Sequence, residues 1–250
     1  MKTTGNTILI TGGATGIGLA LAEAFLKAGN EVVICGRRTQ RLLEAQSRLP
    51  EVHIKTCDVA DAAERQALFD WTVANFRRLN ILVNNAGIQR PLDFANNAVD
   101  LLNAGDAEVA INLQAPIQLS ALFIPHLRTQ AAAAIVNITS VLGFIPLATV
   151  PVYCATKAAL HSFSWALRHQ LRETSVKVFE VAPPVVDTEL QAGVRSQKGS
   201  TAQGISPQVV AEATLQALAH DHYETAIGAA RFLRWGARLA PQQLFKRINA

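Results

Sequence analysis

Short apolar segments alternate with longer amphipathic segments along most of the chain. Apolar, β-branched runs that suit strands occupy residues 7–11, 31–35, 52–56, 81–84, 134–139 and 176–181. Apolar residues recur at helical spacing over 17–28, 39–49, 61–76, 104–128 and 153–172. Strands that are apolar on both faces and alternate with helices predict a parallel sheet covered by helices on each side.

Crossovers between parallel strands are right-handed, so the expected fold is a doubly wound, Rossmann-like α/β sheet. No linker divides the 250 residues, and we expect a single domain over 1–250. The long polar stretch at 191–206 is rich in Gly, Ser and Gln, and a loop of this length predicts a lid over a binding site. Half of the residues are hydrophobic, which excludes a disordered chain.

The formal net charge of +4 belongs to the C-terminal tail. No acidic residue follows Glu224, whereas five basic residues do: Arg231, Arg234, Arg238, Lys246 and Arg247. Without those five, the rest of the chain has a net charge of −1. Because no zinc-finger or RNA-binding motif accompanies the tail, we do not expect a nucleic-acid partner.

The tail continues beyond a candidate strand at 223–227. Pro241 divides residues 229–250 into two helical pieces, each with an apolar face: Phe232, Trp235 and Leu239 on the first, and Leu244, Phe245 and Ile248 on the second. The favoured interpretation is that these faces pack on the body of the protein or on a sister subunit. The alternative is peripheral contact with an anionic membrane surface, where the arginines meet phosphate.

Cysteine and histidine usage indicates neither disulfides nor a metal site. Cys35, Cys57 and Cys154 are an odd number without a Cys-x-x-Cys pair, which is typical of a reducing compartment. The N-terminus has no signal-peptide core, so we expect a cytoplasmic protein. His220 and His222 lie close together, but no ligand cluster completes a site around them, and we expect no metal.

A glycine-rich turn joins the first predicted strand to the first predicted helix. It reads Thr11-Gly12-Gly13-Ala14-Thr15-Gly16-Ile17-Gly18, a Gly-x-x-x-Gly-x-Gly spacing. Gly12 permits the turn, Gly16 lets the backbone approach a pyrophosphate, and Gly18 lets helix and strand pack closely. Amides at the start of the helix then face the phosphates. Its position predicts a dinucleotide cofactor.

The end of the second predicted strand indicates which dinucleotide binds. An acidic residue there would bind the ribose 2′-hydroxyl of NAD and repel a 2′-phosphate. This chain has Gly36-Arg37-Arg38, in which Gly36 leaves room and Arg37 can bind phosphate with a forked guanidinium. The alternative is that both arginines are solvated at a helix start, where cations are slightly unfavourable. We therefore expect NADP(H).

Further motifs follow in order along the chain: Cys57-Asp58-Val59, Asn84-Asn85-Ala86-Gly87, Asn112, Ser140 and Tyr153-Cys154-Ala155-Thr156-Lys157. Together with the glycine loop, they make residues 5–190 resemble the short-chain dehydrogenase/reductase family in its short single-domain form. The Pro183-Pro184 pair and the basic tail are similar to a bacterial branch of that family called DltE-like. The family also implies a homodimer or homotetramer.

The resemblance implies roles for individual residues. Asp58 would hydrogen-bond the adenine, although it could instead cap the helix that follows. Asn112 would kink its helix and hold a water against the catalytic lysine, where the alternative is an ordinary polar position. Cofactor contacts are implied for Thr15, Ile17, Val59, Asn85, Ala86, Gly87, Pro183, Val186 and Thr188. Pro184 stands where the family has Gly, which removes an amide donor and puts the geometry at the nicotinamide carboxamide in question.

The catalytic chemistry can also be argued from the residues themselves. Tyr153 and Lys157 are four apart, so they share one face of a predicted helix. A tyrosine pKa of about 10 is high for catalysis at neutral pH, and we expect the Lys157 ammonium and a bound nicotinamide to lower it. Ser140 follows a strand, where it can stabilise a carbonyl oxygen. The set predicts hydride transfer between NADP(H) and a carbonyl compound or its alcohol, with Tyr153 as general acid and base.

The substrate is expected to be a small apolar or amphipathic carbonyl compound or alcohol. This follows from the apolar residues near the site: Leu142, Phe144, Ile145, Leu147, Val150 and Val185. Two other functions stay open. One is a catalytically idle NADP-binding sensor or scaffold on the same fold, and the other is a sugar-nucleotide epimerase or dehydratase of the extended family form.

Overall fold

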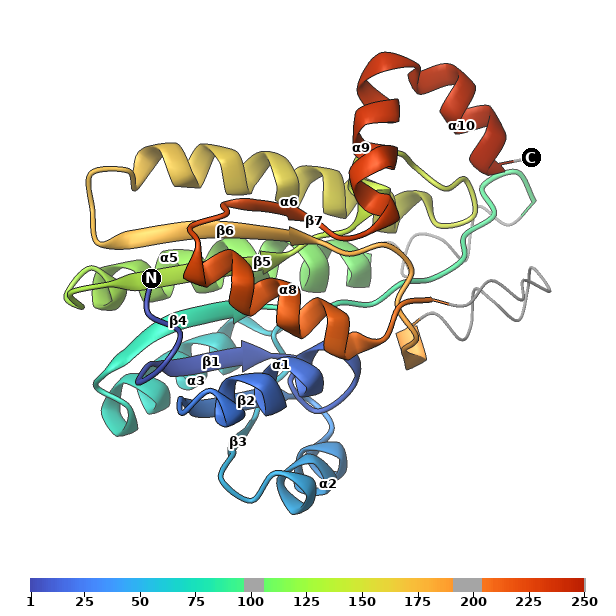
Figure 1. Ribbon diagram of the computed structural model, residues 1–250. Coiled ribbons are helices and arrows are strands. Elements are labelled where there is room, and N and C mark those ends of the chain that lie inside the picture. Colours follow the sequence, from blue (N-terminus) through green and yellow to red (C-terminus); the bar gives the residue numbers. More distant parts are fainter. Residues whose placement is uncertain (97–105, 191–203, 250) are drawn as a thin grey trace.

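The computed structural model describes residues 1–96, 106–190 and 204–249. Within these residues, a seven-stranded parallel sheet has the order β3-β2-β1-β4-β5-β6-β7, and helices cover both of its faces (Figure 1). The strand order therefore reverses between β1 and β4. This confirms the predicted Rossmann-like α/β sheet.

The elements follow the alternation seen in the sequence. The strands are β1 Thr7–Thr11, β2 Glu31–Gly36, β3 His53–Thr56, β4 Leu79–Asn84, β5 Ala133–Ile138, β6 Val176–Ala182 and β7 Glu224–Ala226. The helices are α1 Gly16–Lys27, α2 Thr39–Arg48, α3 Ala62–Asn75, α5 Ala115–Leu127, α6 Pro151–Gln170, α8 Pro207–Ala219, α9 Ala229–Leu239 and α10 Pro241–Asn249. A π-helical turn, η1 Ala110–Gln114, precedes α5, and a 3-10 turn, η2 Val141–Gly143, follows β5.

The predicted strands and helices agree with these bounds to within two residues, including the candidate strand that became β7. The exception is the helix predicted over 104–128, in which the π-helical turn η1 precedes α5. Helix α8 was not predicted. Its buried residues include Ala211, Thr214 and Ala217, which are small or polar and give a weak amphipathic pattern. The predicted lid at 191–206 lies mostly outside the described residues, as does the start of the helix predicted from Ala104.

The core forms two layers, one on each face of the sheet. Strands β1 and β5 are buried along their whole length. Phe25 of α1 and Leu218 of α8 pack on one face, whereas Phe123 of α5 and Leu68 of α3 pack on the other. This burial on both sides explains why the central strands read as continuous apolar runs.

One described helical segment, Asp106–Leu127, is long and apolar enough to cross a membrane. Its inner face, however, includes Leu119, Phe123 and Leu127, which are buried in the core. The core helix of a soluble protein passes the same test of length and composition, so the finding is weak evidence for a span.

The two predicted helical pieces of the tail are present as α9 and α10, which lie together at one end of the molecule (Figure 1). They pack around Val141 and Ile145 through Ala230, Leu233, Ala237, Leu244 and Ile248. The second predicted face thus packs inward through Leu244 and Ile248. The first predicted face does not pack on the body, because Phe232, Trp235 and Leu239 are exposed.

Candidate active site

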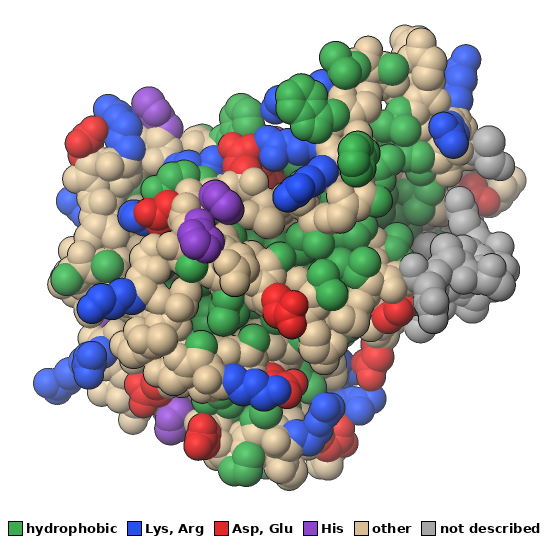
Figure 2. Space-filling model, viewed as in Figure 1, with side chains coloured by type: hydrophobic (Ala, Val, Ile, Leu, Met, Phe, Trp, Pro, Cys, Tyr) green, Lys and Arg blue, Asp and Glu red, His purple; other side chains and the backbone are tan. Residues whose placement is uncertain are grey.

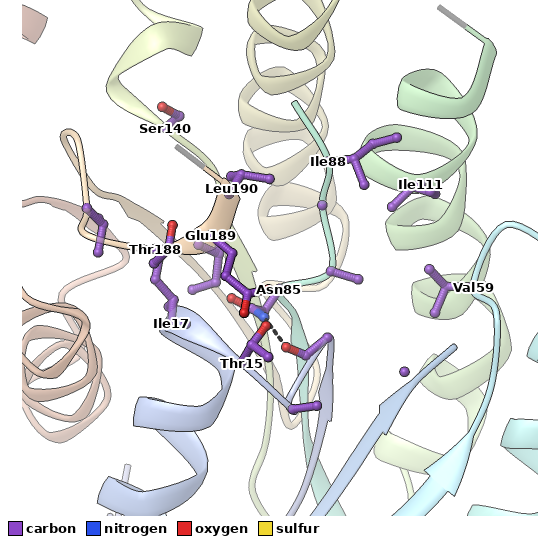
Figure 3. A pocket seen from close by; sticks show the side chains of 18 of the residues that line it. Thr15, Ile17, Val59, Asn85, Ile88, Ile111, Ser140, Thr188, Glu189 and Leu190 are labelled. Atoms are coloured by element: carbon purple, nitrogen blue, oxygen red, sulfur yellow. Dashed lines mark hydrogen bonds between the residues drawn. The ribbon is translucent and has the colours of Figure 1, made fainter. Parts of the chain in front are cut away.

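A cleft lies at the carboxyl ends of the central strands, beside the point where the strand order reverses. Figure 3 shows Thr15, Ile17, Val59, Asn85, Ser140 and Thr188 around it. Of the residues predicted for the site, those that line the cleft are Gly12, Thr15, Gly16, Ile17, Arg37, Arg38, Asp58, Val59, Asn85, Ala86, Gly87, Ser140, Tyr153, Lys157, Pro183, Val186 and Thr188. Gly18 and Asn112 were also predicted for the site but do not line the cleft.

The glycine loop is held against the segment that follows β4. The side-chain amide of Asn85 donates to the carbonyls of Thr11 at 2.9 Å and Gly12 at 3.1 Å. Gly12 has a φ of +64°, and a Cβ there would lie 2.9 Å from the Cα of Ala86. Gly16 also has a positive φ, +53°. The loop can therefore adopt this conformation beside the segment after β4 only with glycine at both positions.

We expect Gly18→Ala to destabilise the fold by about 1–3 kcal/mol. A Cβ at this position would lie 2.2 Å from the carbonyl oxygen of Gly12 and 2.6 Å from the Asn85 amide nitrogen. Urea unfolding measures the loss in the free energy of unfolding. The matched control is Gly36→Ala, where the nearest atom is 4.0 Å away. Equal unfolding midpoints for the two variants would contradict the packing role of Gly18.

The two arginines at the start of α2 differ in their partners. Arg38 lies 3.6 Å from a carboxylate oxygen of Glu189, and Arg41 lies 3.2 Å from the other oxygen of the same carboxylate. Within the described part of the chain, the Arg37 side chain forms no ion pair and faces the cleft unneutralised. Sequence reasoning missed Glu189 because it is 148 residues from Arg41, and no local pattern joins them.

The N-cap role considered for Asp58 is wrong. The residue that caps α3 is Asp61, whose carboxylate accepts from the amide of Glu64 at 2.8 Å. Asp58 instead accepts from the amide of Ala60 at 2.9 Å, in a turn before the helix. The helix begins three residues later than a cap at Asp58 would require, and Asp58 lines the cleft.

Asn112 lies in the π-helical turn η1 and is fully buried. Its amide oxygen accepts from the backbone amide of Ile88 at 2.9 Å, and its amide nitrogen donates to the Ile88 carbonyl at 2.8 Å. The helix irregularity expected at this residue is therefore present. These hydrogen bonds hold the segment of Gly87 and Ile88 close to α6. A Cβ on Gly87 would lie 3.7 Å from Lys157 Nζ.

Tyr153 and Lys157 lie on the buried face of α6, as their spacing predicts. Lys157 Nζ donates to the carbonyl of Ile138 at 2.8 Å and lies 5.6 Å from the centre of the Tyr153 ring. Burial lowers the pKa of Lys157 to about 8. Ser140 lies at the end of β5, where its hydroxyl accepts from the amide of Leu142 at 3.1 Å.

The expectation that Lys157 and a bound nicotinamide lower the pKa of Tyr153 concerns the loaded site and stays a prediction. Burial raises the pKa of Tyr153 well above its ordinary value, and a hydrogen bond with Ser140 opposes that rise. Desolvation dominates because the phenolate would be buried without a counter-charge in direct contact. The Tyr153 hydroxyl therefore keeps its proton at neutral pH.

Two buried carboxyl groups near the site were missed by sequence reasoning. Glu108 is fully buried, accepts from the amide of Arg90 at 2.9 Å, and has its pKa raised by burial. Its charge also disfavours ionisation of Tyr153. Glu180 accepts from the Thr139 hydroxyl at 2.8 Å and lies 2.7 Å from His161 Nδ1, which fixes the strand end next to Ser140. In the sequence both look like surface charges.

Comparison with known families agrees with this geometry. The model of the family described as short chain dehydrogenase matches residues 6–199. The chain belongs to the short-chain dehydrogenase family. It is 52% identical over 249 residues to the uncharacterized oxidoreductase DltE of Bacillus subtilis (strain 168), covering 100% of this chain and 98% of DltE. The similarity to a DltE-like branch is thereby confirmed.

Two solved short-chain dehydrogenases share the fold. One, from Burkholderia cenocepacia J2315 in complex with NADP, has a TM-score of 0.86 and 25% identity, and covers 100% of both chains. The other, from Burkholderia phymatum in complex with NAD, has a TM-score of 0.87 and 24% identity, covering 100% of this chain and 97% of that chain. Since the two carry different dinucleotides, the fold alone does not select one.

The loop after β6 departs from the pattern expected of a short-chain dehydrogenase at Pro184. The carbonyl of the preceding Pro183 accepts from the amide of Val141 at 3.0 Å. On the other side, the carbonyl of Val185 accepts from the amide of Ile205 at 3.0 Å. Backbone bonds thus fix the loop on both sides of Pro184, and Val186 and Thr188 still line the cleft.

Proposed function

We propose that this short-chain dehydrogenase uses NADP(H) to interconvert a carbonyl compound and its alcohol. The observation that carries the proposal is that Ser140, Tyr153 and Lys157 line the same cleft as the glycine loop and Arg37. The groups that would donate a proton, stabilise an oxyanion and bind a dinucleotide therefore face one space.

The residues of the cleft fit an NADP molecule. At Gly12 and Gly16 a Cβ would come within 2.9 Å of Ala86 and 3.0 Å of Thr188, so the loop packs closely against its neighbours, and both glycines also line the cleft. Amides at the start of α1 would hold the pyrophosphate, and the unpaired Arg37 would hold the 2′-phosphate. Asp58 and Val59 would border the adenine, while Val186 and Thr188 would face the carboxamide. When bound, the reduced cofactor supplies a hydride.

In reduction, Tyr153 would donate its hydroxyl proton to the carbonyl oxygen as negative charge develops there. Burial raises the pKa of Tyr153, so the hydroxyl is protonated before the reaction begins. Ser140 would donate a hydrogen bond to the same oxygen. The ammonium of Lys157 would stabilise the phenolate that Tyr153 becomes, and Asn112 would position the Gly87–Ile88 segment beside it.

The pH profile of carbonyl reduction should follow Lys157. Because burial lowers its pKa to about 8, the ammonium is present below that pH and is lost as the pH rises through it. We expect kcat/KM to be flat below about pH 7 and to fall with increasing pH above about 8. Lys157→Arg is the control, because a guanidinium stays protonated and its residual rate should show no fall near pH 8. A wild-type profile without that fall would contradict the role of Lys157.

Glu189→Gln should tighten NADPH binding about two- to fivefold and leave NADH binding unchanged. The carboxylate holds Arg38 and Arg41, and it also places a negative charge beside the proposed 2′-phosphate site. Direct titration with NADPH and with NADH measures the two dissociation constants. Glu44→Gln is the control, because Glu44 pairs with Arg41 at 3.0 Å but does not line the cleft. Weaker NADPH binding in Glu189→Gln would argue against competition with phosphate.

We propose an apolar or amphipathic substrate. A hollow of about 1130 Å³ is lined mainly by apolar residues that include Leu92, Leu142, Leu147, Cys154 and Phe245. Leu142 and Cys154 lie close in the sequence to Ser140 and Tyr153. Of the six residues expected to form such a pocket, Leu142 and Leu147 do line it. The other four lie elsewhere: Val150 is buried beside Tyr153, Ile145 packs on the tail, Phe144 faces His161, and Val185 is exposed.

A panel of aldehydes, ketones and diketones of increasing apolar length tests this function. NADPH oxidation by the wild-type protein should be detectable and should rise with apolar length. Tight NADPH binding without turnover of any member would contradict the proposed activity and favour the cofactor-sensing alternative.

A further inference from the structure

Helix α9 has two apolar faces instead of one. Ala230, Leu233 and Ala237 form the inner face, which packs against the body. The outer face carries Phe232, Trp235 and Leu239, which are 81%, 65% and 80% exposed. Their spacing of three and four residues places them in a single stripe along the helix. A surface helix of a globular protein normally has an apolar stripe only toward the core.

Positive charge borders this outer stripe. Arg231 and Arg238 follow one edge of it, and both are exposed. Within the described part of the chain, neither side chain forms an ion pair. Lys246 and Arg247 add exposed charge on the neighbouring helix α10. Figure 2 shows hydrophobic and basic side chains gathered over these two helices.

Glu224, which lines the same hollow as Arg231, Trp235 and Arg238, is already neutralised. Glu224 lies 3.1 Å from Arg168 through one carboxylate oxygen and contacts Arg234 through the other. No acidic residue follows it in the sequence. The tail surface, defined as Phe232, Trp235, Leu239, Arg231 and Arg238, is therefore apolar and positively charged, and it has no counter-charge of its own.

We propose that the tail surface docks on an anionic lipid bilayer. Aromatic and aliphatic side chains on one helix face, with arginines beside them, are typical of helices that lie in the membrane interface. Phe232, Trp235 and Leu239 would enter the boundary between headgroups and acyl chains. Arg231 and Arg238 would meet lipid phosphates, where guanidinium groups bind well.

A second copy of this chain fits the tail surface less well. In a two-fold symmetric contact the same patch occupies both sides, so four arginines would enter the interface and the patch would supply no carboxylate to pair with them. Each copy would also offer only a single-helix stripe, whereas a stable dimer interface takes about 20–30 residues per side. An anionic bilayer supplies both the opposite charge and the apolar environment.

Co-sedimentation of the full-length protein with vesicles tests the proposal. One set of vesicles is phosphatidylcholine alone, and the other is an equimolar mixture with phosphatidylglycerol. We expect binding to the mixed vesicles at low salt, weaker binding at high salt, and little binding to phosphatidylcholine alone. No binding to the mixed vesicles at low salt would overturn the proposal, and it would leave the proposed enzymatic function untouched because no substrate is involved.

Three variants assign the binding to the tail surface. Phe232→Ser/Trp235→Ser/Leu239→Ser should abolish sedimentation, and since these side chains are exposed, the fold should persist by circular dichroism. Arg231→Gln/Arg238→Gln should weaken binding about fivefold for each arginine removed. Leu43→Ser is the control, because Leu43 is 45% exposed on α2 at the other end of the molecule, and it should bind as wild type (Figure 1).

Other partners of the tail surface would give different results in these experiments. Vesicle binding retained by the triple variant would overturn the assignment to the tail surface. Wild-type protein that ignores vesicles but forms a dimer that the triple variant loses would make the stripe a contact between copies. Wild-type protein that ignores vesicles but binds soluble polyglutamate through the same residues would indicate an acidic protein partner.

Discussion

Replacing Tyr153 by phenylalanine should lower kcat for carbonyl reduction by about 10²–10⁴-fold. The variant keeps the ring that packs beside Lys157 and removes the hydroxyl that carries the proton. NADPH affinity should be nearly unchanged, because the proposed phosphate and adenine contacts come from the glycine loop, Arg37 and Asp58. Steady-state kinetics and direct NADPH titration on the same preparation separate the two effects.

Tyr223→Phe is the matched control, since Tyr223 and Tyr153 are the two tyrosines of the sequence. Tyr223 lies against Phe179 at a ring distance of 5.2 Å and does not line the cleft. The control should keep wild-type turnover. Turnover in Tyr153→Phe at the level of this control would refute the assignment of Tyr153 as proton donor.

Replacing Arg37 by glutamine should weaken NADPH binding about 10–100-fold, the range expected for losing a charge-assisted hydrogen bond to phosphate. NADH binding should not change, because NADH lacks the 2′-phosphate. Arg37 is chosen over Arg38 because Arg38 is already paired with Glu189. Fluorescence titration of both cofactors gives the two dissociation constants.

Arg48→Gln is the control for general loss of positive charge on the same helix. Arg48 is exposed in the last turn of α2 and does not line the cleft. It should bind both cofactors as the wild type does. Wild-type protein that binds NADH as tightly as NADPH, or an equal loss for both cofactors in Arg37→Gln, would contradict the choice of NADP(H).

The sheet and most of the site residues could be predicted because their signals are local. The strands are short apolar runs, and the glycine loop and the Tyr153–Lys157 pair are fixed by spacing within one turn or one helix. Asn112 could be singled out because asparagine is unusual inside an apolar helix, and it does lie in a π-helical turn. Such patterns can be recognised in the sequence without knowledge of tertiary contacts.

What could not be predicted depends on contacts between distant residues. Glu189 reaches Arg38 and Arg41 across the cleft, and Glu108 is buried although its neighbours give no sign of it. Lys157 could be placed beside Tyr153 because the two are near in sequence. The burial of Tyr153, which raises its pKa, could not be predicted because burial depends on the whole fold.

The sequence also did not predict which face of the tail helix α9 packs on the body. Its two amphipathic helices could be read from the sequence, but α9 has apolar residues on two sides. The more strongly apolar stripe, with Phe232 and Trp235, was expected to be the packed one. The body instead contacts the opposite side of α9, through Ala230, Leu233 and Ala237.

The most direct test of the central claim follows deuterium from NADPH that carries deuterium at both positions on C4 of the nicotinamide. The substrate is the compound that turns over fastest in the carbonyl panel, and the product is examined by NMR. Direct hydride transfer predicts that the wild-type protein places deuterium on the carbinol carbon. Alcohol product without deuterium at that carbon, or deuterium released into water, would contradict it.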